Sequence, residues 1–172
     1  YCTAEPTETV SGGLLRDALS GASRRTVCEM AAMFVFDRIN HNVNPVNGIQ
    51  KMLNDGFDVI CDRYYYSSLA YQGVDGAIDW VAGMNLDCPF ITKPDICIFL
   101  DMDPEKCHEH IRAGRTHFEI YEENAAMIAE TRRRYGIVFE MLKDRDNIAI
   151  IDSTGTIEEV FEQIKTEIDK LL

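Results

Sequence analysis

The sequence is poor in several features that mark particular classes of protein. It has no run of apolar residues long enough to span a membrane and no signal-peptide pattern at its start. Its 17 Lys and Arg are outnumbered by 29 Asp and Glu, which gives a formal net charge of −12. We therefore expect neither nucleic acid nor an anionic membrane surface as a partner.

The six cysteines lack the spacings that mark metal sites or redox pairs. No CxxC pair occurs among them. Cys61 and Cys97 lie in apolar, strand-like runs, where a cysteine acts as a small hydrophobic residue. This usage predicts a reduced, cytoplasmic compartment.

The sequence also lacks an initiating methionine. It begins with 1-YCTAEP-6, which resembles the end of a strand already under way, so we expect further residues to precede Tyr1. A length of 172 residues with 46% hydrophobic residues predicts one domain over 1–172.

Apolar runs alternate with amphipathic segments along the whole chain. Strands are expected at 57–62, 95–102 and 147–152, and helices at 12–20, 24–41, 45–56, 66–73, 76–84, 104–113, 121–143 and 156–172. We expect Ser11 and Thr156 to cap helices and Pro45 to lie in a first turn. The alternation predicts an α/β fold, a parallel sheet flanked by helices on both faces.

The segment 62-DRYYYSSLAYQG-73 follows a strand that we expect to be buried. Ligands of α/β proteins bind where strands end. An arginine fork suits a phosphate, and hydroxyl and amide groups suit a ring with donors and acceptors. A lone arginine is most often a solvated surface charge. We favour a ligand contact for Arg63 because it follows Asp62 at the strand end, but not for Arg112 or Arg115 taken alone.

Phe34 and Arg38 are four residues apart, so on a helix they share a face. Periodicity alone would make Phe34 an ordinary core residue. An aromatic ring beside a guanidinium can instead stack on a planar base and bond its edge.

Several stretches together resemble the thymidylate kinase (dTMP kinase) family of P-loop nucleoside monophosphate kinases. They are 3-TAEPT-7, 34-FVFDRINH-41, 62-DRYYYSSLAYQG-73, 93-KPDICIFLDMDPE-105 and 151-IDSTGTIEEV-160. The resemblance covers essentially the whole chain. It implies transfer of the γ-phosphoryl group of MgATP to dTMP, giving dTDP, and a homodimer.

The resemblance also implies roles around the base and the sugar. Phe34 would stack on thymine and Arg38 would bond the edge of the ring. Ser68 and Gln72 would bond the base, and Tyr71 would exclude a 2′-hydroxyl.

Other implied roles concern the phosphates and the metal. Arg63 would hold the acceptor phosphate, and Arg16 would shape the same pocket. Glu5 and Pro6 would form the loop that closes one side. Asp62 would lie near the transferring phosphate and its Mg²⁺.

The lid of the family corresponds to residues near 112–122, where Arg112 and Arg115 would neutralise charge on the phosphoryl group. The family often has arginines where this chain has Ala4 and Ile120. The loop residues Asp152, Ser153 and Thr154 would border the adenine of ATP.

No GxxxxGK[ST] pattern, the donor-phosphate loop of such kinases, occurs in these residues. We therefore expect a first strand and helix to lie before Tyr1, and the chain alone to be inactive.

Two readings stay open beside dTMP phosphorylation: a kinase for another nucleoside monophosphate, and a non-catalytic nucleotide-binding module. A purely structural domain does not explain Asp62 and Arg63 beside Ser68 and Gln72. The helix with Met30, Met33 and Phe34 supplies either a dimer surface or intramolecular core.

Overall fold

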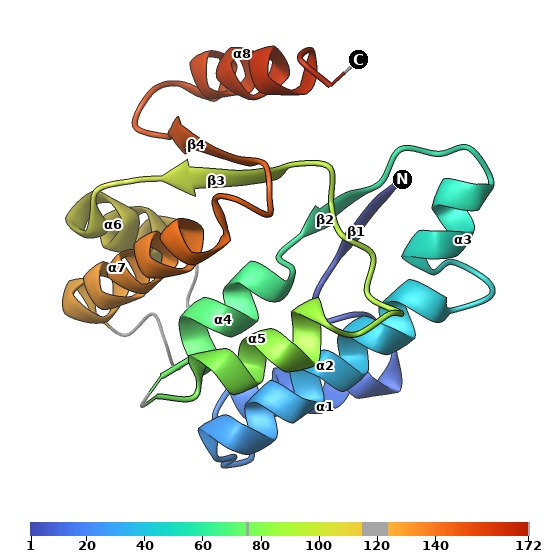
Figure 1. The fold of residues 1–172 in the computed structure, drawn as a ribbon. Helices are drawn as coiled ribbons and strands as arrows, with labels where there is room; N and C mark the ends of the chain where they lie inside the picture. The colour runs from blue at the N-terminus through green and yellow to red at the C-terminus, as the bar shows by residue number, and fades with distance from the viewer. Residues whose placement is uncertain (75, 115–123, 172) are drawn as a thin grey trace. The chain divides into compact units, whose positions relative to one another are not determined.

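The computed structural model of the protein describes residues 1–74, 76–114 and 124–171. The chain forms two compact units, Tyr1–Lys93 and Pro94–Leu172. Figure 1 labels their elements. The first unit contains β1 (Cys2–Ala4), α1 (Val10–Leu19), α2 (Val27–Val43), α3 (Ile49–Asn54), β2 (Ile60–Asp62), α4 (Tyr65–Gln72) and α5 (Ile78–Leu86). The second contains β3 (Cys97–Asp101), α6 (Pro104–Gly114), α7 (Ala125–Leu142), β4 (Ile148–Asp152) and α8 (Ile157–Ile168).

In the first unit, β1 and β2 pair in parallel, with Ala4 opposite Asp62. The backbone N–H of Glu5 donates to the carbonyl of Asp62 at 3.0 Å, directly after the ladder. Because the two strands run in the same direction, the residues after β1 and after β2 leave the sheet at the same edge. This places the Glu5 loop beside the segment that begins with Arg63.

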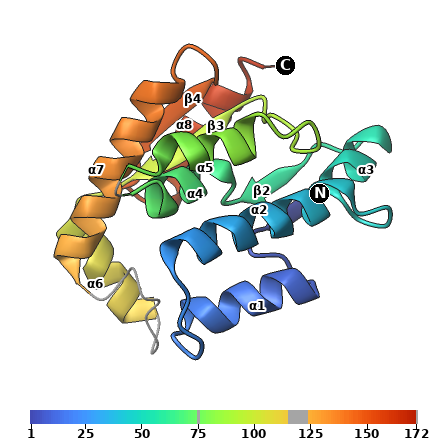
Figure 2. The ribbon, with the colours of Figure 1, turned by 60° about the horizontal axis from the view of Figure 1, so that its bottom comes forward.

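The apolar core of the first unit lies between its helices. Figure 2 shows α1 alongside α2, and α2 also packs on α4 and α5. The side chains buried at these contacts include Leu15, Met30, Ala31, Tyr65, Leu69 and Val81. A capping box begins α2, since Thr26 and Glu29 bond each other's backbone N–H groups.

In the second unit, β3 and β4 pair in parallel from Cys97–Ile148 to Asp101–Asp152. Phe99 of β3 packs on two rings of α7, with centroid distances of 4.9 Å to Tyr135 and 5.0 Å to Phe139. Aromatic burial of this kind fixes the helix against the strand pair.

The expected alternation of helices with parallel strands is confirmed, although the described strands form two separate pairs. Two details are wrong. Ser11 does not cap α1, which begins after Thr9, because the Ser11 hydroxyl bonds Asp37 instead. Pro45 is not in the first turn of α3, because Asn44 Oδ1 accepts from the N–H of Val46 and holds this segment as a turn.

Burial also differs from expectation at the strands. The run that ends in β2 is not buried, since Ile60 is 65% exposed and Phe57 is 55% exposed. In α2, Met30 is core rather than surface, and Phe36 is the exposed aromatic residue at 62%. A possible docking face on α2 therefore belongs to Phe36 rather than to Met30.

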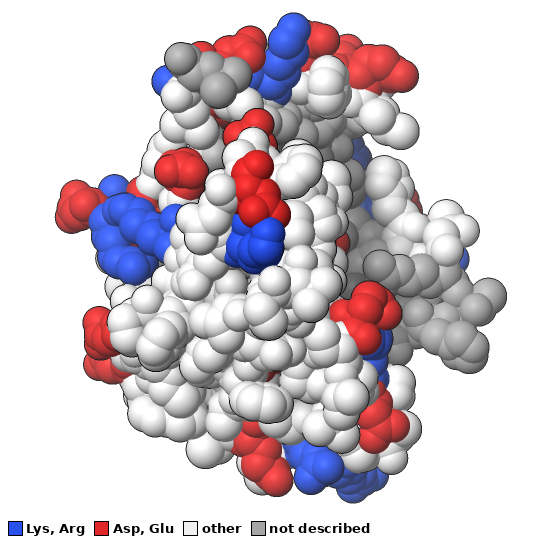
Figure 3. Space-filling model, turned by 90° about the vertical axis from the view of Figure 1, so that its right-hand side faces the viewer, with Lys and Arg blue, Asp and Glu red and all other residues white. Residues whose placement is uncertain are grey.

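Lys and Arg are interspersed with acidic groups on the face shown in Figure 3. The part of that face formed by described residues has no continuous basic surface of the kind that binds nucleic acid. None of the helices in the described ranges combines the length and the apolar character needed to cross a bilayer.

Candidate functional site

The loop after β1 is anchored to α2 by one buried carboxylate. Asp37 accepts from the backbone N–H of Thr7 at 2.8 Å and from the Thr7 hydroxyl at 2.6 Å. The Ser11 hydroxyl donates to the same carboxylate at 2.6 Å. Arg16 Nη1 donates to the carbonyls of Pro6 at 3.1 Å and Thr7 at 2.6 Å. Arg16 therefore shapes this loop from the other side.

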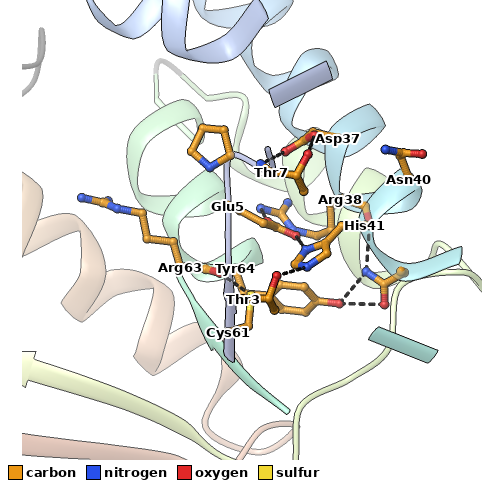
Figure 4. A network of polar contacts seen from close by, with 12 residues as sticks. Thr3, Glu5, Thr7, Asp37, Arg38, Asn40, His41, Cys61, Arg63 and Tyr64 are labelled. Carbon is orange, nitrogen blue, oxygen red and sulfur yellow. Dashed lines mark hydrogen bonds and ion pairs between the residues drawn. The ribbon is translucent and has the colours of Figure 1, made fainter. Parts of the chain in front are cut away.

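Glu5 brings a buried negative charge to the end of β1, as Figure 4 shows. Its Oε2 lies 2.6 Å from Arg38 Nη2, and both side chains are 1% exposed. Its Oε1 lies 3.0 Å from His41 Nδ1. His41 Nε2 in turn lies 2.7 Å from Thr3 Oγ1. A chain of polar contacts thus fixes the carboxylate that neutralises Arg38.

Arg38 Nη1 makes two further contacts. It donates to Ser68 Oγ of α4 at 3.1 Å and to Asn85 Oδ1 of α5 at 2.5 Å. Arg38 Nε is buried and has no hydrogen-bond partner, and the same is true of Gln72 Oε1 on α4. Unsatisfied buried groups are costly, so an open donor and an open acceptor here suggest a ligand.

Tyr64 packs beneath the guanidinium. Arg38 Cζ lies 5.2 Å from the centroid of the Tyr64 ring. The Tyr64 hydroxyl accepts from Asn42 Nδ2 at 2.9 Å and donates to the carbonyl of Thr92 at 3.0 Å. Burial raises the pKa of Tyr64, so this residue stays a neutral phenol.

Arg63 follows a strand that is exposed rather than buried. Its side chain is exposed, and its φ is 63°, in the left-handed region that residues other than glycine seldom adopt. Its guanidinium lies 5.7 Å from the centroid of the Tyr71 ring. Strained backbone of this kind clusters at ligand sites.

Two other expected site residues of the first unit are Phe34 and Asp62. Phe34 is half-buried on α2, one turn before Arg38. Asp62 ends β2 with an exposed side chain. An exposed carboxylate fits Mg²⁺, which takes one or two carboxylates and fills its other positions with water and phosphate oxygens.

The remaining expected residues belong to the second unit. Arg112 lies exposed in the last turn of α6, whereas Arg115 and most of the lid at 112–122 lie outside the described residues. Asp152 Oδ1 accepts from Thr154 Oγ1 at 2.7 Å and from its N–H at 2.9 Å, which lowers the pKa of Asp152. Ser153 Oγ donates to the carbonyl of Asp101 at 2.8 Å.

An open hollow of about 590 Å³ adjoins this loop. Its lining includes four carboxylates, those of Asp152, Glu158, Glu159 and Glu162. Such a surface repels phosphates.

Sequence reasoning missed several residues of the buried network: Asp37, His41, Asn42, Tyr64 and Asn85. Asp37 and His41 belong to the stretch 34-FVFDRINH-41 that carried the resemblance, and the place of His41 three residues after Arg38, on the same helix face, was a usable signal. For Asn85 the signal was weaker: it is a polar residue in a mostly apolar helical segment.

The parallel strand pairs define an α/β protein. A buried guanidinium with unpaired polar groups lies beyond a strand end, where α/β proteins bind their ligands. A family model described as "Thymidylate kinase" matches residues 1–164. The chain belongs to the thymidylate kinase family.

Three relatives illustrate how far this likeness extends. The chain is 34% identical to the "Probable thymidylate kinase" of Methanococcus aeolicus over 169 residues, which cover 94% of this chain and 79% of the relative. It is 33% identical to that of Pyrococcus abyssi over 168 residues, 94% of this chain and 77% of the relative. It is 30% identical to the "Thymidylate kinase" of Caldicellulosiruptor saccharolyticus over 173 residues, 99% of this chain and 81% of the relative.

Proposed function

We propose that the protein transfers the γ-phosphoryl group of MgATP to dTMP and releases dTDP, as a P-loop nucleoside monophosphate kinase of one domain over 1–172. Membership of the family supports the reaction. The observation that carries the choice of base is the pair of open polar atoms, Arg38 Nε and Gln72 Oε1.

Several contacts bring these two atoms toward one region. Gln72 is one helical turn after Ser68 on α4, so the two side chains share a face. Ser68 accepts from Arg38 at 3.1 Å, which places that face against the guanidinium. Gln72 and Arg38 are each 1% exposed, so the part of a ligand that contacts them is shielded from water.

One open donor and one open acceptor match thymine. Its O4 accepts a hydrogen bond and the adjacent N3–H donates one, whereas cytosine presents a donor and an acceptor in the opposite order. Cytosine would therefore place a donor against the buried Nε–H donor of Arg38. A site built on hydrogen bonds rejects such a ligand strongly. Half-buried Phe34 supplies an aromatic face for the ring.

The other residues of the first unit hold the rest of dTMP. Arg63 offers an exposed guanidinium for the acceptor phosphate, and its neighbour Tyr71 lies against the deoxyribose. Arg16 holds the carbonyls of Pro6 and Thr7 and keeps the loop of Glu5 and Pro6 closed over the site.

When bound, MgATP supplies the phosphoryl group and the metal that draws charge from the phosphate oxygens. Asp62 would hold the metal through its exposed carboxylate. Arg112 and Arg115 would neutralise charge at the lid, and Asp152, Ser153 and Thr154 would border the adenine.

Calorimetric titration with dTMP, dUMP, dCMP and AMP tests the assignment of the base. We expect the tightest binding for dTMP and a loss of at least about tenfold for dCMP. A Gln72→Leu variant should lose dTMP affinity and should gain none for AMP. Equal binding of dTMP and dCMP by a folded protein would contradict the proposal.

The chemical step is tested separately, by following dTDP formation from dTMP and MgATP. Turnover of another monophosphate in preference to dTMP would support the alternative kinase. Tight dTMP binding without turnover by the protein read from its complete gene would support a non-catalytic module.

We also propose a homodimer in the cytoplasm. Phe36 is 62% exposed and Val43 is 42% exposed, seven residues apart on one face of α2, which gives an apolar surface for a second copy. Six cysteines without a disulfide among them agree with a reducing compartment. Light scattering should give the mass of a dimer, and Phe36→Glu should halve it. An unchanged mass in Phe36→Glu would place the interface elsewhere.

A further inference from the structure

Both terminal nitrogens of Arg38 are held by residues from other elements. Nη2 lies 2.6 Å from Glu5 Oε2 at the end of β1. Nη1 donates to Ser68 on α4 and to Asn85 on α5, and the Asn85 contact is the shorter, at 2.5 Å. The guanidinium is therefore fixed from three directions.

The amide of Asn85 is itself fixed in orientation. Its Nδ2 donates to the carbonyl of Val81, one turn earlier on α5, at 2.8 Å. With the nitrogen engaged there, the oxygen is left to face Arg38 Nη1. The residue is 1% exposed, so the contact is shielded from bulk water.

A guanidinium is planar and rigid, so holding its two terminal nitrogens also sets the direction of the Nε–H bond. Nη1 carries two hydrogens, and Ser68 and Asn85 accept them both. Without Asn85, one of these hydrogens becomes a second open donor beside Nε. A site with two open donors no longer distinguishes the edge of thymine from a base edge that presents a ring-nitrogen acceptor.

We propose that Asn85 is a positioning residue for base selection: it holds Arg38 so that Nε alone is presented to the ligand. The proposal rests on the proposed function, in which Arg38 bonds the edge of thymine. Asn85 acts through Arg38 and does not touch the reacting phosphate.

The test compares Asn85→Ala with Asn42→Ala. Asn42 is a matched control because it is also a fully buried asparagine of the first unit, and its side chain bonds Tyr64 and the Arg38 backbone carbonyl but not the guanidinium. Each variant is titrated with dTMP and with dCMP and is melted by heat. We expect both variants to melt at lower temperature, because each leaves buried groups unpaired.

The two variants should differ in selectivity. For Asn85→Ala we expect dTMP to bind about tenfold more weakly and dCMP affinity to change by less than about threefold. For Asn42→Ala the ratio of the two affinities should stay as in the unsubstituted protein. Asn85→Asp keeps an oxygen toward Nη1 and should keep that ratio within about twofold, even though it loses the donor to Val81.

An equal change of ratio in Asn85→Ala and Asn42→Ala would overturn the proposal, because it would make Asn85 merely structural. If Asn85→Ala does not fold, the Asn85→Asp variant is the deciding test. A folded Asn85→Asp protein that no longer prefers dTMP over dCMP would also overturn the proposal. Failure of the proposed function is distinguishable, because the unsubstituted protein would then show no preference for dTMP over dCMP.

Discussion

Asp37 holds Thr7 with both oxygens of its carboxylate, one on the backbone N–H at 2.8 Å and one on the hydroxyl at 2.6 Å. Asp37 directly precedes Arg38 on α2, and Thr7 lies two residues after Glu5. The contact therefore fixes the distance between the two elements that carry the buried ion pair. Asp37 is 0% exposed, so the anchor is also part of the interior.

Replacing this anchor should lower stability strongly. In Asp37→Ala the N–H of Thr7 and the hydroxyls of Thr7 and Ser11 all lose their acceptor. We expect a loss of about 3 kcal/mol in the free energy of unfolding, measured with urea. Asp37→Asn keeps one oxygen acceptor and should lose less. A loss in Asp37→Ala below about 1 kcal/mol would show that water replaces the anchor.

Adjacent glycines of α1 provide a matched pair for the same loop. A Cβ at Gly12 would collide with the backbone of Thr7, whereas a Cβ at Gly13 would meet nothing within 4 Å. We expect Gly12→Ala to destabilise the fold and to weaken dTMP binding, because α1 must move away from the loop. Gly13→Ala should raise stability by about 0.5–1 kcal/mol, since alanine favours the helix. Thermal melts of both variants check this, and equal melting temperatures would contradict the close approach.

The cysteines should differ in reactivity according to burial. Burial raises the pKa of Cys61, with Glu5 adding to the effect, and burial raises the pKa of Cys97 to about 12. Cys2 and Cys28 are exposed. Because the thiolate is the reactive form, an alkylating agent at pH 8 should label Cys2 and Cys28 at least about tenfold faster than Cys61 and Cys97. Mass spectrometry of the labelled peptides measures the four rates. Fast labelling of Cys61 would mean that the end of β2 opens readily.

Much of the fold followed from local sequence signals. The strands ending at Asp62 and Asp152 and the capping of α8 by Thr156 follow from periodicity and from short-range hydrogen bonds. The Ser11 cap was wrong because a tertiary partner, Asp37, competes for its hydroxyl. No local signal could report that competition.

The candidate site was likewise predictable from the sequence only in part. Arg38, Ser68 and Gln72 lie in stretches that resemble a family, and the structure brings the first two into contact. Asn85 joins them from 47 residues away along the chain, and periodicity says nothing about so distant a contact. The exposure of Arg63 depends on how far neighbouring elements cover β2, which is again a tertiary property.

The capping box of α8 gives a prediction for the second unit. Thr156 accepts from the N–H of Glu159 at 3.2 Å, and Glu159 accepts from the N–H of Thr156 at 2.8 Å. Thr156→Ala removes one half of this exchange and should cost about 1 kcal/mol in urea denaturation. Thr166→Ala, in the last turn of the same helix, is the control. It loses only a bond to the carbonyl of Glu162 and should change stability by less than about 0.5 kcal/mol. Equal losses of stability in the two variants would mean that the capping box of Thr156 and Glu159 does not form in solution.

Glu130 gives a prediction about acid stability. Hydrogen bonds from Arg133 and then Arg134 lower its pKa from 4.5 to about 2. A carboxyl whose pKa is lower in the folded state than in the unfolded state stabilises the fold above the unfolded pKa. That contribution should therefore be complete above about pH 4.5 and should disappear as the pH falls towards about 2. The side chain lies at the surface, so added salt should weaken the effect.

An NMR titration of the Glu130 carboxyl carbon measures this pKa directly. Arg133→Ala should move the midpoint towards 4.5 by more than Arg134→Ala does, because the Arg133 hydrogen bond is the larger cause. Glu130→Gln cannot titrate, so between pH 4.5 and 2 its stability should fall less steeply than that of the unsubstituted protein. A midpoint near 4.5 in the unsubstituted protein would show that the two arginines are mostly bound to water. The surface of α7 would then contribute nothing to acid resistance.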